Sequence, residues 1–213
     1  MKKAQYKPEL FDFMIRQLRD IGRLPVKPVI DFGINSGKVL DLGCGSGVIS
    51  LEWLLATKDS HLTAIDNDPR MLRLAEKNAS EYVKQHGLDA ARINFMEADA
   101  TNLPFDSDSF DGLFSYNTLH EVPNPSKMLK EAWRALKPGG LYCIRDLHAG
   151  GDWTELEFAQ KMDRLQDIKE TVAACLATAF TEDEFKTIIS ESPMSSGNLL
   201  IKPMLLSISG KTA

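Results

Sequence analysis

Three aspartates stand at or just beyond the ends of short apolar runs in the first half of the chain: Asp41, Asp66 and Asp99. Soon after the first of them, residues 43–47 read Gly-Cys-Gly-Ser-Gly. Glycine adopts positive φ angles and lets a ligand approach the backbone where any Cβ would collide. Open α/β sheets bind their ligands at the carboxyl ends of strands, where these aspartates are expected to lie. The pattern therefore predicts a binding site for a ligand that carries a nucleoside.

The spacing of the glycines narrows the choice of nucleoside ligand. A dinucleotide-binding turn needs glycine or alanine directly after Gly47, and Val48 stands there. No phosphate-loop lysine follows the glycines, which disfavours hydrolysis of a nucleoside triphosphate. Asp66 lies 19 residues after Gly47, close to the usual place of a carboxylate that accepts ribose hydroxyls. The alternative is that Asp66 caps the next helix, but Asp68 fits that role better because Pro69 follows it.

Apolar periodicity predicts the elements that would position these residues. Strands are expected at 39–41, 61–65, 93–96, 110–116 and 141–144. Helices are expected at 8–21, from 48 onward, over 69–87 and over 125–136, with a loop or irregular helix at 25–37. Because single helices separate the five strands, the connections should be right-handed crossovers in a mainly parallel sheet. The expected fold is a doubly wound α/β fold.

The whole chain, 1–213, is expected to form one domain, because nothing in its composition separates two cores. Residues 1–37 would form an N-terminal helical cap, 38–146 the binding core, and 147–213 lid helices with a terminal strand. That strand, near 204–208, is expected to be antiparallel or at an edge. Two capping boxes are expected to open helices in the last part of the chain: Asp152 with Glu155, and Thr181 with Glu184.

The N-terminal helix and the stretch 152–179 are the elements expected to cover the carboxyl edge of the sheet. Their large apolar side chains would either line a ligand pocket or pack the helices onto the domain. The candidates are Trp153, Phe158, Met162 and Phe180.

Composition limits the class of protein and its partners. The formal net charge of −5 argues against a broad nucleic-acid footprint, so no nucleic-acid partner is expected. No apolar run approaches the roughly 20 residues that span a bilayer, and no apolar signal-peptide segment follows the N-terminal lysines. The three cysteines are widely spaced, which favours free thiols in a reducing compartment. We therefore expect a cytoplasmic protein with no membrane partner; its oligomeric state is not readable from the sequence.

The glycine run and the aspartates that follow it resemble those of the class I S-adenosylmethionine-dependent methyltransferases. Within this class, the chain resembles the ubiquinone/menaquinone C-methyltransferase-like group. The resemblance spans about 38–146 and rests on motifs that occur in the family's order: 39–47, 64–68, 97–105, 109–111, 117–122 and 136–140. It implies the Rossmann-like fold of that class, S-adenosylmethionine as cofactor and a small-molecule methyl acceptor.

The resemblance also implies roles for individual residues. The backbone of Gly43, Cys44, Gly45 and Gly47 would lie against the methionine and ribose parts of the cofactor, while Asp41 holds its amino group. Asp66 would bind the ribose hydroxyls, Asn67 would lie beside the adenine, and Asn117 would lie near the methionine end. Asp99 would accept the adenine amino group while the Ala100 N–H serves a ring nitrogen. The alternative for Asp99 is a turn-forming residue whose side chain bonds its own backbone.

Methyl transfer by in-line displacement needs alignment first, and needs a base only where the acceptor loses a proton. His120, in the loop after the fourth strand, is the candidate base because its ordinary pKa is near 6.5. Asp146, at the end of the fifth strand, would bind substrate; alternatively His120 packs locally and Asp146 pairs with Arg145 at the surface.

No metal site is expected, because Cys44, Cys143 and Cys175 lack the spacing of metal ligands. Two other functions stay open: transfer of a different group from a sulfonium donor, and binding of the cofactor without catalysis.

Overall fold

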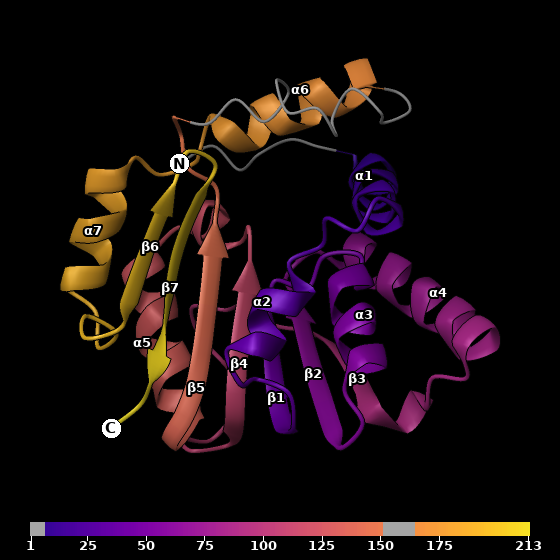
Figure 1. Cartoon of the computed structure of the whole chain (residues 1–213), viewed down its shortest axis with the longest axis horizontal. Coiled ribbons are helices and arrows are strands. Elements are labelled where there is room, and N and C mark those ends of the chain that lie inside the picture. Colours follow the sequence, from indigo (N-terminus) through magenta and orange to yellow (C-terminus); the bar gives the residue numbers. More distant parts are fainter. Residues whose placement is uncertain (1–6, 151–164) are drawn as a thin grey trace.

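The computed structural model describes residues 7–150 and 165–213, which contain a seven-stranded sheet in the order β3-β2-β1-β4-β5-β7-β6 (Figure 1). The strands are β1 (Gly37–Leu42), β2 (Ser60–Asp66), β3 (Ile93–Glu97), β4 (Phe110–Tyr116), β5 (Leu136–Asp146), β6 (Asn198–Lys202) and β7 (Leu205–Lys211). The α-helices are α1 (Pro8–Asp20), α2 (Val26–Asp31), α3 (Val48–Ala56), α4 (Pro69–His86), α5 (Pro125–Ala135), α6 (Leu165–Leu176) and α7 (Glu182–Ser190). Two 3₁₀ helices are η1 (Ala90–Arg92) and η2 (Leu119–Glu121).

The first five strands are parallel, and the strand order reverses between β1 and β4. At this junction Asp41 of β1 lies beside Ala64 of β2 on one side and Phe114 of β4 on the other. Such a reversal opens a crevice at the carboxyl ends of the strands, which is where ligands bind in open α/β sheets. The predicted doubly wound, mainly parallel fold is confirmed.

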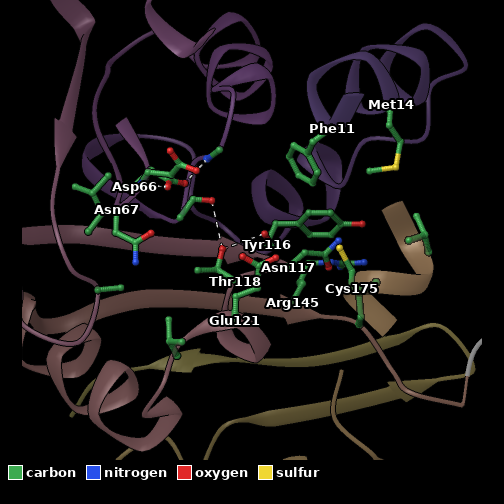
Figure 2. A pocket seen from close by; sticks show the side chains of 18 of the residues that line it. Phe11, Met14, Asp66, Asn67, Tyr116, Asn117, Thr118, Glu121, Arg145 and Cys175 are labelled. Atoms are coloured by element: carbon green, nitrogen blue, oxygen red, sulfur yellow. Dashed lines mark hydrogen bonds between the residues drawn. The ribbon is translucent and has the colours of Figure 1, made fainter. Parts of the chain in front are cut away.

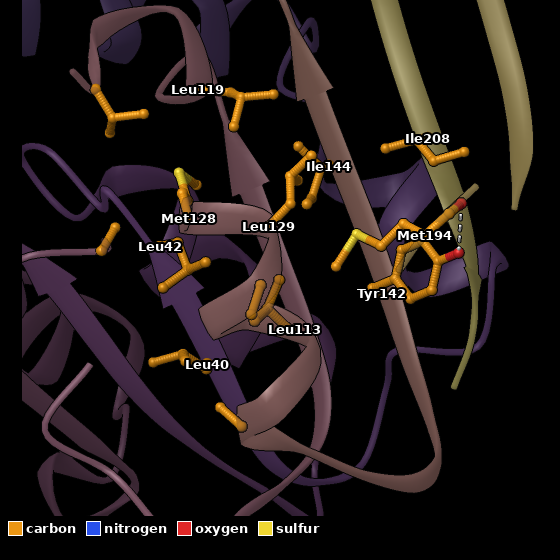
Figure 3. Close-up of a cluster of buried hydrophobic side chains, with 14 of the residues drawn as sticks. Leu40, Leu42, Leu113, Leu119, Met128, Leu129, Tyr142, Ile144, Met194 and Ile208 are labelled. Atoms are coloured by element: carbon orange, nitrogen blue, oxygen red, sulfur yellow. Dashed lines mark hydrogen bonds between the residues drawn. The ribbon is translucent and has the colours of Figure 1, made fainter. Parts of the chain in front are cut away.

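Apolar side chains of the strands point alternately to the two faces of the sheet, and each face has its own hydrophobic core. Leu40 and Leu42 of β1 belong to the core that also contains Leu129 of α5 and Phe185 of α7 (Figure 3). Val39, the residue before Leu40, points to the other face and joins the opposite core with Trp53 of α3. Because successive side chains of a strand point to opposite faces, both faces need helices to cover them.

Two predicted elements differ from the structure. β5 begins at Leu136 instead of 141, because Leu136 already pairs with Phe110 of β4; the register then shifts across residues 137–140, where Gly139 has a φ of +78°, and regular pairing begins at Leu141. The terminal strand β7 is antiparallel as predicted, but it lies inside the sheet between β5 and β6. The edge belongs to β6, whose Leu199 and Leu200 are exposed.

Helices α1 and α6 lie beyond the carboxyl ends of the strands, where cap and lid elements were expected (Figure 1). The apolar side of α1 contributes Met14 and Ile15 to a small core with Val48 of α3 and Val172 of α6. Within the residues that the structure describes, no helix is long and apolar enough to cross a membrane.

The capping box of Thr181 and Glu184 is confirmed at the start of α7. Phe180 is buried in the core against Phe185, so its side chain packs α7 and lines no pocket. The other predicted lid residues, Asp152, Trp153, Glu155, Phe158 and Met162, lie outside the described residues.

Candidate functional site

A cavity of about 340 Å³ lies at the carboxyl ends of the strands, beneath α1 and α6 (Figure 2). One wall, which we call the cavity floor, consists of Gly43, Gly45, Asp66, Asn67, Ala100 and Asn117. The opposite wall, which we call the helical cover, consists of Phe11, Met14 and Leu18 of α1 and Val172 and Cys175 of α6. The reversal of strand order therefore opens into a cavity between the strand ends and helices α1 and α6.

The glycine turn forms the central part of the cavity floor. A Cβ at Gly43 would lie 2.2 Å from the Thr118 hydroxyl oxygen, and one at Gly45 would lie 3.2 Å from the Phe11 ring. Both residues have positive φ, which glycine alone adopts at little cost. Gly47 differs, because its Cβ would lie 2.9 Å from side-chain atoms of both Ala75 and Phe95. It does not line the cavity; its small size allows close packing of the turn against α4 and β3.

Asp66 ties the end of β2 to the glycine turn. One carboxylate oxygen accepts the Gly45 N–H at 2.8 Å, and the other accepts the Asp68 N–H at 2.9 Å. Asp68 is the N-cap of α4, as predicted, because its side chain accepts the Arg70 N–H. Asp66 also lines the cavity, so its carboxylate faces a ligand that binds there.

Asp41 is almost fully buried and lies under a second cavity of about 20 Å³. This small cavity also contacts Cys44 and shares Gly43 with the larger one. Burial, together with the charge of Asp66, raises the pKa of Asp41 to about 7, although the Ser50 hydroxyl, which donates to Asp41 at 2.5 Å, opposes the shift. A space of this size holds one water molecule or an ammonium group.

The third predicted strand-end aspartate does not line the cavity. Asp99 is exposed, and its carboxylate accepts the Thr101 N–H and hydroxyl, both at 2.8 Å. The structure therefore supports the turn-forming alternative for this residue. Its neighbour Ala100 does line the cavity, and so does Asn117, whose φ of 53° turns the chain at the end of β4.

His120 and Asp146 form a buried pair beneath the cavity and do not line it. Asp146 lies 2.5 Å from His120 Nδ1 and also accepts the backbone N–H groups of His120 and Leu147, at 3.1 and 2.6 Å. Burial lowers the pKa of His120, but the Asp146 carboxylate outweighs burial and raises it to about 10. A protonated imidazole has no lone pair that could accept a proton, and Asp146 joins the side chain and the backbone N–H of His120 to the end of β5.

The cavity contains polar groups that the sequence did not single out. Tyr116 and Arg145 occupy matching positions in β4 and β5, and both side chains line the cavity (Figure 2). Glu121, in the loop after β4, has a side chain that is only 17% exposed and also lines the cavity. Tyr116 and Arg145 carry the same signal as the aspartates, since each lies at the carboxyl end of a strand.

Cys175 also joins this end of the cavity. Potential ligand atoms of His120, Glu121 and Cys175 lie within 4.8 Å of one another, although α6 is far from the other two residues in sequence. Because Asp146 holds His120 as a cation, the cluster does not present a ready donor nitrogen. The expectation that the chain has no metal site stays a prediction.

Comparison with known proteins agrees with this arrangement. Residues 35–192 match the sequence model of a family described as a methyltransferase domain. The chain is 37% identical over 110 residues to a ubiquinone/menaquinone biosynthesis C-methyltransferase from Bartonella quintana, covering 51% of this chain and 40% of that protein. It is 35% identical over 117 residues to erythromycin 3''-O-methyltransferase from Saccharopolyspora erythraea, covering 54% of this chain and 36% of that protein. The chain thus spans less than half of the length of these relatives.

The fold is similar to that of a solved structure from Methanococcus maripaludis described as a putative S-adenosylmethionine-dependent methyltransferase. The two share 21% identity and a TM-score of 0.75, over 100% of this chain and 98% of the other. Agreement at this level of identity concerns the arrangement of strands and helices.

Proposed function

Because this chain belongs to the methyltransferase domain family that it matches over residues 35–192, we propose that it transfers a methyl group from S-adenosylmethionine to a small-molecule acceptor. The observation that carries the proposal is the bond between Asp66 and the Gly45 N–H in the cavity floor. It places a carboxylate beside a turn in which Gly43 and Gly45 carry no side chain, as a nucleoside with a charged tail requires.

The residues of the floor fit this cofactor. Gly43 and Gly45 leave the space that a Cβ would fill, and Asp66 is available to the ribose hydroxyls. Asp41 lies under a cavity large enough for the cofactor's amino group. Asn67 and the Ala100 N–H would bind the adenine, and Asn117 would lie near the methionine end. We leave Asp99 out of this set because it does not line the larger cavity. Gly47 and Cys44 would contribute by fixing the backbone conformation of the glycine turn.

When bound, the cofactor supplies an electrophilic methyl group on a sulfonium sulfur. The protein's part is to align the acceptor in line with that methyl group and to exclude water. The helical cover, with Phe11 and Met14 over the floor, supplies the exclusion. For an acceptor that loses a proton, Glu121 is the carboxylate that lines the cavity in the loop after β4, and the His120–Asp146 pair holds that loop.

Calorimetric titration with S-adenosylhomocysteine tests the site. We expect Asp66→Ala and Gly45→Val each to weaken binding by more than tenfold, while Glu76→Ala, on the exposed side of α4, leaves it unchanged. Unchanged affinity in both site variants would contradict the site assignment. Incubation with methyl-labelled cofactor and a metabolite extract then tests the reaction, since only methyl transfer places label in a product.

The acceptor and compartment are proposed only in general terms. The two curated relatives are named for a C-methyl and an O-methyl transfer, so they do not fix the accepting atom here. A reducing compartment such as the cytoplasm is supported by the three buried cysteines, all of which are free.

A further inference from the structure

Arg145 is a cavity residue without a counterion in the part of the chain that the structure describes. Its side chain lines the cavity near the carboxyl end of β5, and its Nε is buried with no hydrogen-bond partner. Arg70, another cavity arginine, instead pairs with Asp68 at 2.7 Å. A guanidinium cannot lose its charge at ordinary pH, so a buried donor of this kind is stabilised by an acceptor that arrives with a ligand.

The neighbours of Arg145 explain why it stays unpaired. Asp146, the next residue, points to the opposite face of the sheet because side chains alternate along a strand, and there it binds His120. On the cavity face the matching residue in β4 is Tyr116. Burial raises the pKa of Tyr116 while the Arg145 charge lowers it, so the tyrosine stays neutral beside the cation. Its hydroxyl can donate to the same ligand group.

Arg145 lies away from the part of the cavity assigned to the cofactor. The glycine turn follows β1, while Arg145 is the next-to-last residue of β5, two strands away in the sheet. Neighbouring strands are about 4.8 Å apart, so the two positions are separated by about 10 Å. The same cavity is lined by Val172, Met204 and Leu205, and Leu205 comes directly before the β7 residue that pairs with Asp146. This end of the cavity therefore joins one cation to an apolar surface.

We propose that Arg145 binds a carboxylate group of the methyl acceptor, and that the acceptor is an amphipathic carboxylic acid with an apolar body. The inference rests on the proposed function, because it assigns the acceptor end of that same site. A guanidinium and a carboxylate form two parallel hydrogen bonds, which fix the orientation of the bound molecule as well as its charge. A single unpaired cation matches the single charge of a carboxylate.

Matched small molecules test the charge requirement. Phenylacetate and phenylacetamide have nearly the same shape, and only the first is an anion. NMR titration of the S-adenosylhomocysteine-loaded protein should show at least tenfold tighter binding of phenylacetate. Arg145→Gln should remove the preference, and Arg145→Lys should retain part of it, because lysine keeps the charge without the paired hydrogen bonds. Arg73→Gln, an equal change of net charge at an exposed position of α4, should leave the preference intact.

Titration with S-adenosylhomocysteine distinguishes a failure of the Arg145 inference from a failure of the proposed function. We expect all variants to bind it within twofold of wild type. A large loss of its affinity in Arg145→Gln would overturn the inference, because Arg145 would then hold the cofactor's own carboxylate. Equal binding of the two probes, binding of neither, or a preference that survives in Arg145→Gln would also overturn it. Failure of the wild type to bind S-adenosylhomocysteine would instead contradict the proposed function.

Discussion

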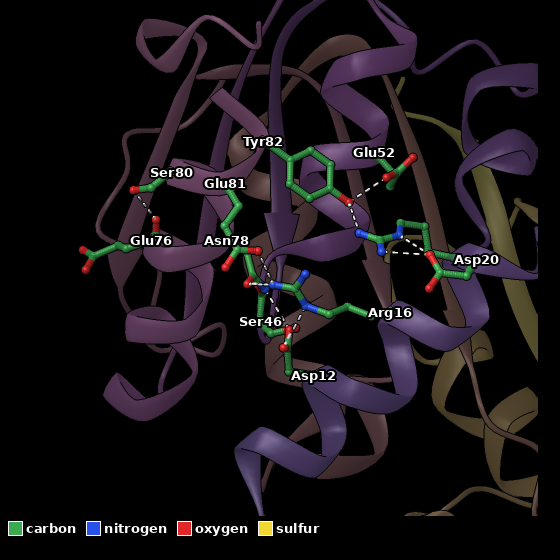
Figure 4. A network of polar contacts seen from close by, with 11 residues as sticks. Asp12, Arg16, Asp20, Ser46, Glu52, Glu76, Asn78, Ser80, Glu81 and Tyr82 are labelled. Atoms are coloured by element: carbon green, nitrogen blue, oxygen red, sulfur yellow. Dashed lines mark hydrogen bonds and ion pairs between the residues drawn. The ribbon is translucent and has the colours of Figure 1, made fainter. Parts of the chain in front are cut away.

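The cavity floor and the helical cover face the same cavity, but different contacts hold them in place. The floor is fixed by the backbone of buried parallel strands, since Gly43 and Cys44 donate to the Ile65 carbonyl at 2.8 and 2.9 Å. The cover is fixed by side chains: Arg16 of α1 donates to Asn78 and to Glu81 of α4, the latter at 3.0 Å (Figure 4).

This difference predicts unequal local stability. Opening the floor would break the sheet and both large cores, whereas opening the cover would break only the contacts of α1 and α6. Proteins open locally where few buried contacts must be lost. The floor is therefore the preformed part of the site, and the cover is the part that can admit ligands.

Removal of His120 should have the largest effect on stability, because it leaves the Asp146 carboxylate buried without its counterion. We expect His120→Ala to lower the free energy of unfolding by about 3–5 kcal/mol. The pair also predicts a pH dependence. Its folded-state pKa lies above the ordinary 6.5, so its stabilisation is complete below pH 6.5 and is lost as pH rises through about 10.

Urea unfolding of wild type and His120→Ala at pH 6, 8 and 10 measures both effects. The difference between the two proteins should shrink as pH rises. A difference that is the same at all three pH values would show that the pair is not charged, and that the loop after β4 is held by packing alone.

Gly43→Ala should destabilise the cavity floor at the glycine turn. A side chain there combines a strained φ of 76° with collision against Thr118, for a total cost of about 2–4 kcal/mol. Gly87→Ala is the matched control, because Gly87 has a φ of 67° but open space around it. That variant should lose only about 1–2 kcal/mol of backbone strain. Urea unfolding gives both values, and equal losses would mean that the turn yields to the extra methyl group.

Arg16→Ala should loosen the cover while leaving the floor intact. Its removal deprives the fully buried Asn78 side chain of one partner, which costs about 1–3 kcal/mol. Hydrogen exchange should become faster in α1 and stay unchanged in β1 and β4. Lys186→Ala, which removes an exposed pair with Glu182, should leave the stability and the exchange rates of α1 unchanged. Equal acceleration in α1 and β1 would contradict the separation of the two regions.

The floor could be predicted because its signals are local. The glycine run, the spacing to Asp66 and the capping pair at Asp68 and Pro69 each occur within a few residues, and each lies where it was expected. For Asp99 the same local signal fits both a ligand contact and a turn. The direction of its side chain, toward Thr101, favours the turn.

The cover could not be predicted in the same way. The contact between Arg16 and Asn78 joins residues 62 positions apart, and no local period encodes it. The place of β7 inside the sheet depends likewise on pairing with β5, far along the chain. A surface pair of Arg145 with Asp146 was one of two alternatives left open, and the structure excludes that pair because Asp146 binds His120 on the opposite face of the sheet.

The smallest predicted effect concerns Asp41, which joins the floor to the cofactor's proposed amino group. Its folded-state pKa of about 7 means that the free protein holds it partly protonated near neutral pH. A cationic group binds the ionised carboxylate, so cofactor affinity should rise with pH, by at most about tenfold per unit, and level off above pH 7. Calorimetric titration with S-adenosylhomocysteine at pH 5.5, 6.5 and 7.5 measures this rise.

Two variants sharpen the assignment to Asp41. Asp41→Asn cannot ionise, so its affinity should be lower and flat across this range. Ser50→Ala removes the hydroxyl that stabilises the ionised form, so the rise should move to higher pH. A flat profile in wild type would show that Asp41 does not contact the ligand cation. A rise that persists in Asp41→Asn would assign it to another group, and the floor would then act through the glycine turn and Asp66 alone.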